Sequence, residues 1–545
     1  MTYGRRIMRG MPVPDDPDLV SALDAMSAED LRAFVRDALE RLDDELRAGL
    51  QDRLIARAAQ GSSGWRPSIP PSGLVEEAKG FAESACRVGH AEPRDVDHYL
   101  RCGSKAFLAG DYPAARQVFA AFLPPIADGE IYLGQHEMVD EVLTASEHEC
   151  AAQYVVNVYI TTPLASRAGA VLEAIGAVRG IASFWSPLEQ MERVAIGLLP
   201  ELDAFLPAWV EHLERQPVPE SEWVDDRGRW LREAVLRLEG VAGLERVARE
   251  TERPEAVHAW CEALVERRQW AEALRAYDDA AKMVRTSRWR GGLLDGAALA
   301  AEQLGRRDAI KRLQAAWLGA PSLVRLLRWL GAGAPAASTV SKRAKQALER
   351  CPTKSGRQLG LLHLLAGNVR EAAKLLAKAP GLGWSSDEHP GHILFPAFAG
   401  MLGNGTEAGP SATLLAGLRE PVRDPLDWDF GDGRRPRLAT PAVADLIAVA
   451  GPGAKLDSKS RTAMLDAMQS AATKRVEGIL GNKRRRHYGH AASLVSCCVE
   501  LAPAVGKQKP MASWLESLRR EHSRFYAFRE ELQAALASVS SEPEE

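Results

Sequence analysis

The sequence predicts an all-α protein, an irregular α-solenoid of antiparallel helix pairs with an N-terminal helical segment and a long loop insertion. Three observations predict this fold class. Helix-favouring Ala, Leu, Arg and Glu dominate the composition, and β-branched stretches are few. Apolar residues recur at helical spacing over most of the chain, with regular Gly, Pro or Asp breaks. A short motif that opens a helix also recurs, and a length of 545 residues suits several domains or a repeat array.

The chain divides by composition into six parts. Residues 1–60 form an N-terminal helical segment, in which Ser27 is the expected N-cap of a helix that carries Glu29 and Asp30 in its first turn. A Gly-, Ser- and Pro-rich linker is expected at 61–72, and the main helical repeat region at 73–380. A Gly/Pro/Asp-rich insertion (381–438), a C-terminal helical region (439–537) and a disordered acidic tail (538–545) complete the chain.

Three segments need separate comment. Residues 154–162 contain many β-favouring side chains, but their helical flanks favour a buried helix over a strand. A long helix is expected from Ser458 to about Leu480. One amphipathic helix is expected from about Pro510 to Leu536.

The recurring motif is a helix end, a short polar break, an apolar residue, and Ala three positions later on a new helix. The apolar residue opens the second helix of a pair, and the small Ala lets that helix approach its neighbour closely. The four openings and their alanines are Tyr112 and Ala115, Trp270 and Ala273, Val369 and Ala372, and Tyr488 and Ala491.

This motif resembles the tetratricopeptide repeat and its degenerate relatives. The copies do not follow a constant period, and the Trp and Pro that complete the family pattern are mostly missing. The resemblance therefore implies an irregular solenoid of stacked helix pairs and not a regular array.

The C-terminal stretch resembles the helical tail of bacterial proteins related to those with a SWIM-type zinc finger. The matching residues are Tyr488, Ala491, Cys498, the segment 514–520 and the segment 526–532. The finger itself, a C-x-C followed by C-x-H, is absent, so no zinc-dependent role is implied for this chain.

The charge distribution and the cysteine usage indicate the kind of partner and the cellular compartment of the protein. Residues 1–300 carry a net charge of −15 and residues 301–545 a net charge of +11, for a total of −4. Such asymmetry suits contacts between the halves or a basic surface for an acidic partner. Seven scattered cysteines without a C-x-x-C pair favour a reducing compartment. Neither a signal peptide nor a membrane span is recognised, so we expect a cytoplasmic protein.

Two polar clusters are candidates for metal binding. Asp387, Glu388, His389 and His392 could coordinate zinc or manganese if their loop folds back, or His389 could simply cap a helix that starts near Ile393. An acidic and histidine-rich stretch at 130–149 would place two potential ligands four residues apart on a helix, or would form a solvated acidic face. The aspartates of 424–433 resemble a calcium loop but lack its final Glu.

A basic run at 483–487 is the candidate for partner binding. Clustered Lys and Arg attract phosphate groups or acidic proteins, although a solvated helix start or a salt bridge to the acidic half would also explain them. Lys342, Arg343, Lys474 and Arg475 lie elsewhere in the same basic half. The residues expected to bind the partner are Arg484, Arg485, Arg486 and Tyr488.

No motif identifies a reaction, a catalytic residue or a cofactor, so the chain is not expected to be an enzyme. The leading hypothesis is a scaffold that binds a protein or peptide on a helical-repeat surface. The alternative is a nucleic-acid-associated regulatory or defence protein that uses the basic C-terminal half. A metal-dependent enzyme centred on 387–392 is the third hypothesis. The oligomeric state is not predicted.

Overall fold

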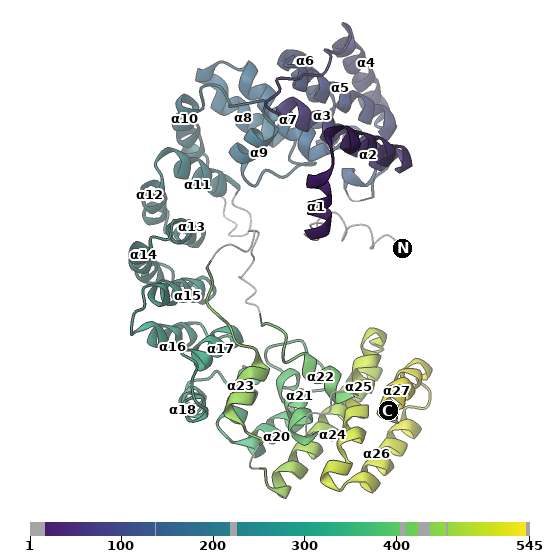
Figure 1. Cartoon of the computed structure of the whole chain (residues 1–545), viewed down its shortest axis with the longest axis vertical. Coiled ribbons are helices and arrows are strands. Elements are labelled where there is room, and N and C mark those ends of the chain that lie inside the picture. The colour runs from purple at the N-terminus through teal and green to yellow at the C-terminus, as the bar shows by residue number, and fades with distance from the viewer. Residues whose placement is uncertain are drawn as a thin grey trace. The chain divides into compact units, whose positions relative to one another are not determined.

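The computed structural model describes residues 17–136, 138–217, 226–403, 410–422, 436–453 and 456–540 (Figure 1). These residues form 27 α-helices, three short 3₁₀ turns and no β-strand. The fold is an all-α solenoid of consecutive helix pairs, as the sequence predicts. The chain separates into two compact units, unit 1 (residues 1–244) and unit 2 (residues 245–545).

In unit 1 about half of the helices pack against the next helix along the chain. Its helices are α1 (Pro17–Ala25), α2 (Ala28–Arg41), α3 (Asp44–Gln60), α4 (Leu74–Val88), α5 (Pro93–Ala109), α6 (Tyr112–Ala127), η1 (Val139–Glu141), α7 (Glu147–Thr161), α8 (Leu164–Ala177), α9 (Pro187–Val194), α10 (Leu202–Arg215) and α11 (Asp226–Leu238). The largest contacts between successive helices run from α5 through α8 and between α10 and α11. The boundary between the units falls inside α12 (Val241–Thr251).

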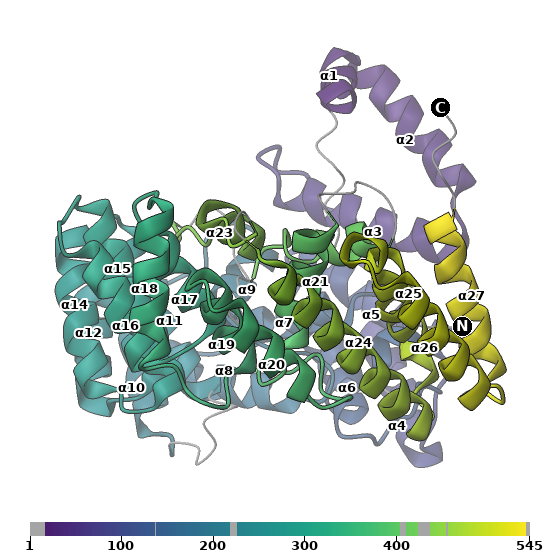
Figure 2. The same cartoon turned by 90° about the horizontal axis from the view of Figure 1, so that it is seen from below.

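Unit 2 continues the same pairing and ends with a bundle of longer helices (Figures 1 and 2). Its helices are α13 (Pro254–Glu266), α14 (Trp270–Met283), α15 (Ser287–Gln303), α16 (Ala309–Gly319), α17 (Leu323–Gly331), α18 (Ala337–Leu348), α19 (Gly356–Leu365), α20 (Val369–Lys378), α21 (Gly391–Leu402), α22 (Pro410–Ala416), α23 (Val443–Ala450), α24 (Ser458–Gly481), η2 (Arg485–His487), α25 (Tyr488–Leu501), η3 (Pro503–Val505), α26 (Gln508–Glu521) and α27 (Tyr526–Ser540).

The recurring motif marks the second helix of a pair in all four copies. Helices α6, α14, α20 and α25 begin at Tyr112, Trp270, Val369 and Tyr488, as predicted. Their alanines are completely buried: the exposed fraction is 0% for Ala115, Ala273, Ala372 and Ala491. A methyl side chain at these positions leaves room for the facing helix, which is the basis of the close pairing.

Two local predictions are confirmed and one is wrong. Ser27 caps α2 by accepting a hydrogen bond from the Asp30 amide, and the β-favouring stretch 154–162 lies almost entirely in the buried helix α7. The prediction of one helix over 510–536 is wrong. The chain turns at His522 and divides this segment into α26 and α27, because α27 folds back to bury Phe528 and Leu532 against the core that contains α25.

Between α20 and α24 the chain leaves the stack. Helix α24 packs directly on α20, whereas α21 lies alongside α19 and α24, and α23 lies alongside α17 and α18. The predicted insertion 381–438 therefore carries α21 and α22 within its described parts. No helix of the described ranges is long and apolar enough to cross a membrane.

The close contact between the end of α20 and α24 predicts that one added methyl group destabilises unit 2. A Cβ at Gly381 would lie 1.9 Å from the carbonyl oxygen of Lys474, a backbone atom that cannot move aside cheaply. We expect Gly381→Ala to lower the free energy of unfolding of unit 2 by about 1–3 kcal/mol, as overpacking typically does. Urea denaturation followed by circular dichroism measures this. Gly481→Ala, where a Cβ meets no atom within 4 Å, is the control. Equal unfolding midpoints for both variants would contradict the close contact.

Candidate functional sites

Two polar stretches from the sequence analysis, 387–392 and 483–488, are neighbours in unit 2. Their histidines lie close enough for the charges of His389 and His392 to affect His490, which is in the first turn of α25. A tryptophan that the sequence analysis did not select, Trp384, lies at their centre. We call the following six side chains the Trp384 cluster: Trp384, His389, His392, Arg475, His487 and His490.

Trp384 joins three elements of the fold. It is 4% exposed, and its ring stacks on His389 with a centroid distance of 4.7 Å. The ring of His490 from α25 meets it edge-on at 5.2 Å. The guanidinium carbon of Arg475 from α24 lies 5.8 Å from the centroid, within the range of a cation–π contact. The start of α21, α24 and α25 are thus held together by aromatic contacts.

His389 is a helix-capping residue in this structure. Its Nε2 donates to the carbonyl oxygen of Pro380 (2.8 Å), and its Nδ1 accepts a hydrogen bond from the backbone N–H of Gly391 (3.0 Å). The latter bond satisfies one of the free amides at the start of α21. Both ring nitrogens are therefore engaged, and the ring is 2% exposed.

The other three residues of the proposed metal set do not converge on His389. Asp387 accepts a hydrogen bond from Arg357 (2.9 Å) and is largely exposed, and Glu388 and His392 are also exposed. Across the described ranges, no group of three or more His, Cys, Asp or Glu side chains is arranged to hold a metal ion. The capping alternative therefore describes the local geometry, and the calcium-like segment 424–433 lies outside the described residues.

The electrostatics of the cluster favour neutral imidazoles. Burial lowers the pKa of His490 to about 4, with further contributions from Arg475, His392, His487 and His389. Burial also lowers the pKa of His389 and that of Arg475 to about 10. Partial desolvation, with the positive charges of nearby arginines, lowers the pKa values of His392 and His487. Three buried polar atoms here, Nε1 of Trp384, Nε of Arg475 and Nδ1 of His490, have no hydrogen-bond partner among the described residues.

Next to the cluster, Arg484, Arg485 and Arg486 are all exposed on the turn that precedes α25. Within the described part of unit 2 none of them forms an ion pair; Arg486 donates only to the ring of His487 (3.1 Å). Tyr488, the fourth residue expected to bind the partner, is not exposed in the same way. It is 5% exposed and packs edge-on against Phe528 at 5.9 Å, because it opens α25 on the side that faces α27.

Other basic residues donate hydrogen bonds to backbone carbonyl oxygens. Lys474 Nζ donates to the carbonyl oxygen of Ala377 at the end of α20 (2.7 Å), and Arg343 donates to three carbonyl oxygens at the end of α17. Cations stabilise the negative ends of helices, so these residues are not available to a partner.

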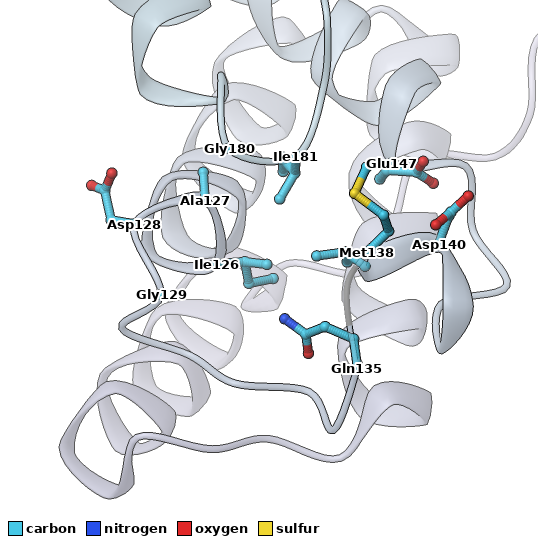
Figure 3. A pocket seen from close by; sticks show the side chains of 11 residues that line it. Ile126, Ala127, Asp128, Gly129, Gln135, Met138, Asp140, Glu147, Gly180 and Ile181 are labelled. Atoms are coloured by element: carbon cyan, nitrogen blue, oxygen red, sulfur yellow. The ribbon is translucent and has the colours of Figure 1, made fainter. Parts of the chain in front are cut away.

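Unit 1 contains a cavity of about 270 Å³ in the acidic, histidine-rich stretch of the sequence (Figure 3). Its lining comes from the C-terminal end of α6, the loop before α7, the start of α7 and the α8–α9 connection. The lining residues are Ile126, Ala127, Asp128, Gly129, Gln135, Met138, Val139, Asp140, Glu147, Gly180 and Ile181. The two potential ligands four residues apart are His136 and Asp140. They do not share a helix face, because Asp140 lies in η1 and His136 lies outside any helix.

The loop that forms one wall of the cavity is fixed at both ends. At its start, Tyr132 exchanges backbone hydrogen bonds with Gly89 and Ala91. At its end, the buried carboxylate of Asp97 accepts hydrogen bonds from the amides of Thr144 and Ala145. No local pattern distinguishes Asp97, because its role depends on residues almost 50 positions away.

Glu147 is the most buried acidic group of the cavity, with 8% exposure. Its Oε1 contacts His148 Nδ1 at 2.7 Å, and this hydrogen bond raises the pKa of His148. Asp140 and Glu147 lie on one side of the cavity beside Met138, and Asp128 lies on the other (Figure 3).

Comparisons with known proteins add little to this description. No family model and no curated protein matches the sequence. Among solved structures, the chain is similar to a "circular tandem repeat protein with novel repeat topology and enhanced subunit contact surfaces". The identity is 15%, the TM-score is 0.13, and the match covers 92% of this chain and 95% of that one. At so low a TM-score, nothing about this chain is inferred from the match.

The Trp384 cluster predicts a loss of stability in acid. The pKa of folded His490 lies below that of an unfolded histidine, so the unfolded chain takes up the proton first as the pH falls. The contribution is fully present above about pH 6.5 and is lost as the pH falls to about 4. At about 1.4 kcal/mol per pKa unit, the loss is about 3 kcal/mol.

Urea titrations of the wild type and His490→Asn between pH 7 and pH 4 measure this loss of stability. We expect a flatter pH profile for this variant, and the wild-type profile for His136→Asn, which changes an exposed histidine. A wild-type slope in His490→Asn would contradict the assignment.

Proposed function

We propose that this chain is a non-catalytic scaffold, with tetratricopeptide-like repeats, that binds a protein partner on a surface of unit 2. The observation that carries the proposal is the exposed run Arg484–Arg486, which forms no ion pair within the described part of that unit. Helical-repeat surfaces bind partners without catalytic groups, and arginine is enriched among residues that contribute most to protein interfaces.

The charge of this surface indicates the partner. Three adjacent guanidinium groups repel one another, and a carboxylate-rich segment would relieve that repulsion through charge-assisted hydrogen bonds. Behind them, the Trp384 cluster supplies a firm base, because Trp384 holds α24 and α25 together. We therefore propose an acidic protein segment as the partner, in the cytoplasm of a bacterium; the seven unpaired cysteines support a reducing compartment.

The same arginines favour nucleic acid as the second candidate partner. Phosphate groups also bind guanidinium groups in a bidentate manner, and such binding weakens steeply with salt. Tyr488, the aromatic side chain that follows the run, is buried and offers no face for base stacking. The protein partner is therefore the better supported of the two.

A charge-reversal experiment tests the proposal. We expect the triple variant Arg484→Glu, Arg485→Glu, Arg486→Glu to lose its partner in a native pull-down analysed by mass spectrometry. The matched control reverses three exposed arginines of α26 and the following turn, Arg519, Arg520 and Arg524, and changes the net charge equally. Partner recovery by the wild type and control, with or without nuclease, supports the scaffold. Recovery that depends on nucleic acid would transfer the proposal to the second candidate, and recovery by all three proteins would overturn the assigned surface.

A further inference from the structure

We propose that the Trp384 cluster binds a phosphate group through Arg475, Trp384 and His490. The ligand is free phosphate or a phosphate monoester, which share the same tetrahedral anion, and the experiment below separates the two sources. This inference goes beyond the proposed scaffold function and does not depend on it, because none of the three residues belongs to the exposed run Arg484–Arg486.

Arg475 is a buried cation without a carboxylate partner. It is 6% exposed, and within the described ranges it has no ion pair with any Asp or Glu. Its Nη1 donates to the carbonyl oxygen of Gly381 (3.3 Å), its guanidinium lies over the ring of Trp384, and its Nε has no hydrogen-bond partner among the described residues. A buried charge is costly unless an opposite charge compensates it, so this site favours an anion.

Two further nitrogens without partners lie beside Arg475. They are Nε1 of Trp384, which is 4% exposed, and Nδ1 of His490. The ring of His490 lies 5.2 Å from the ring of Trp384, and the guanidinium carbon of Arg475 lies 5.8 Å from it. The indole and Nε of the guanidinium can only donate, and a neutral imidazole donates from Nδ1 in one of its tautomers. Donors from α24, α25 and the segment before α21 therefore surround one ring.

The charge around these donors is positive. After burial, the contributions that lower the pKa of His490 to about 4 all come from arginine or histidine side chains. Burial and the charge of Arg484 lower the pKa of Arg475 to about 10, and no carboxylate opposes them. The exposed run Arg484–Arg486 extends the positive potential to solvent, which would attract an anion toward the cluster.

The carboxylates of this region do not supply the missing negative charge. Asp387 is largely exposed and is paired with Arg357 (2.9 Å). Glu420 and Glu531 are exposed. Within the described parts of unit 2, none of these three acidic residues forms an ion pair with Arg475.

The cluster extends from the interior to the surface. Trp384 and Arg475 are buried, His487 and His490 are half-buried, and His392 is exposed. The three nitrogens are covered in this structure, so a phosphate reaches them when a half-buried imidazole turns toward solvent. Side-chain rotation of this kind is a fast motion and requires no change of the backbone.

Other occupants fit less well. A metal ion would be repelled by Arg475, and the described ranges contain no group of three or more side chains arranged to hold one. A carboxylate carries one charge and two coplanar oxygens. A phosphate carries up to two charges and at least three acceptor oxygens, which suits donors that come from three separate elements.

The indole N–H of Trp384 reports binding directly. The full-length protein, labelled with ¹⁵N, has 13 tryptophans, and Trp384→Phe identifies the indole resonance of Trp384. The protein is titrated at constant ionic strength with inorganic phosphate and with N-acetyl-O-phosphoserine amide up to about 10 mM, the range of weak binding by a single group. We expect a saturable downfield shift with at least one ligand, because a hydrogen bond to phosphate deshields the indole proton.

The pattern of shifts separates the sources of the phosphate group. A shift with both ligands supports recognition of the phosphate group itself, a shift with phosphoserine alone supports a phosphorylated protein segment, and a shift with inorganic phosphate alone supports free phosphate. No saturable shift with either ligand would overturn the inference. An equal shift with N-acetyl-aspartate amide would also overturn it, since the site would then accept any anion.

Two variants test the assigned donors. Arg475→Met removes the guanidinium and keeps a long side chain, and His490→Phe removes both ring nitrogens and keeps an aromatic ring beside Trp384. We expect each to weaken phosphate binding about tenfold, equivalent to about 1.4 kcal/mol. Arg520→Met, on the exposed face of α26, removes the same charge and should bind as the wild type. Unaltered binding by His490→Phe would sink the proposal even if Arg475→Met failed to fold.

The triple variant of Arg484, Arg485 and Arg486 separates this site from the proposed partner surface. A shift that persists in Arg475→Met but is lost in the triple variant would place the phosphate on the exposed arginines and overturn the inference. If phosphate does not bind while the pull-down still recovers a partner, the phosphate site is wrong and the scaffold remains. If phosphate binds through Arg475 but no partner is recovered, the site remains and the scaffold is wrong.

Discussion

Close approach of paired helices at small residues is the constraint on which this fold depends. Ala115, Ala273, Ala372 and Ala491 have no exposed surface, and each lies one turn into the second helix of a pair. Glycine performs the same role where backbones meet outside the pairs, as at Gly381 against Lys474. Larger side chains at these points would separate the helices and leave unfilled volume around the leucines and aromatic residues between them.

Arginine and lysine have two separate roles in this architecture. The fold consists of many short helices, and the C-terminal end of each helix leaves carbonyl groups without intrahelical hydrogen-bond partners. Arg47, Arg227, Arg343 and Lys474 donate to such carbonyl oxygens at the ends of α2, α10, α17 and α20. Because Arg343 and Lys474 belong to residues 301–545, the positive charge of this half is partly structural. Cations outside these caps, such as Arg484–Arg486, can serve recognition.

The fold was largely predictable because its signals are local. Helical periodicity, the Ser27 cap and the apolar–Ala motif depend on residues within one or two turns of each other. The sites were less predictable, because their members meet only through tertiary packing. The sequence does not distinguish Trp384 from other core tryptophans, and it leaves His389 open as a ligand or a helix cap, until the contacts with His490 and Gly391 are known. Tyr488 is recognised as a helix opener, but its burial against Phe528 is not. The turn that separates α26 from α27 was missed for the same reason.

The direct packing of α24 on α20 has a consequence for how such a chain can evolve. Continuity of the stack runs through α20 and α24, while α22 packs on α21 and α25 and Leu418 lies in the core. Lengthening a connection between packed helices costs little free energy, about 0.6 kcal/mol for each doubling. Between residues 403 and 442, insertions and deletions should therefore accumulate outside α22 and Leu418 in descendants of this sequence, while the spacing from α13 to α20 stays nearly fixed.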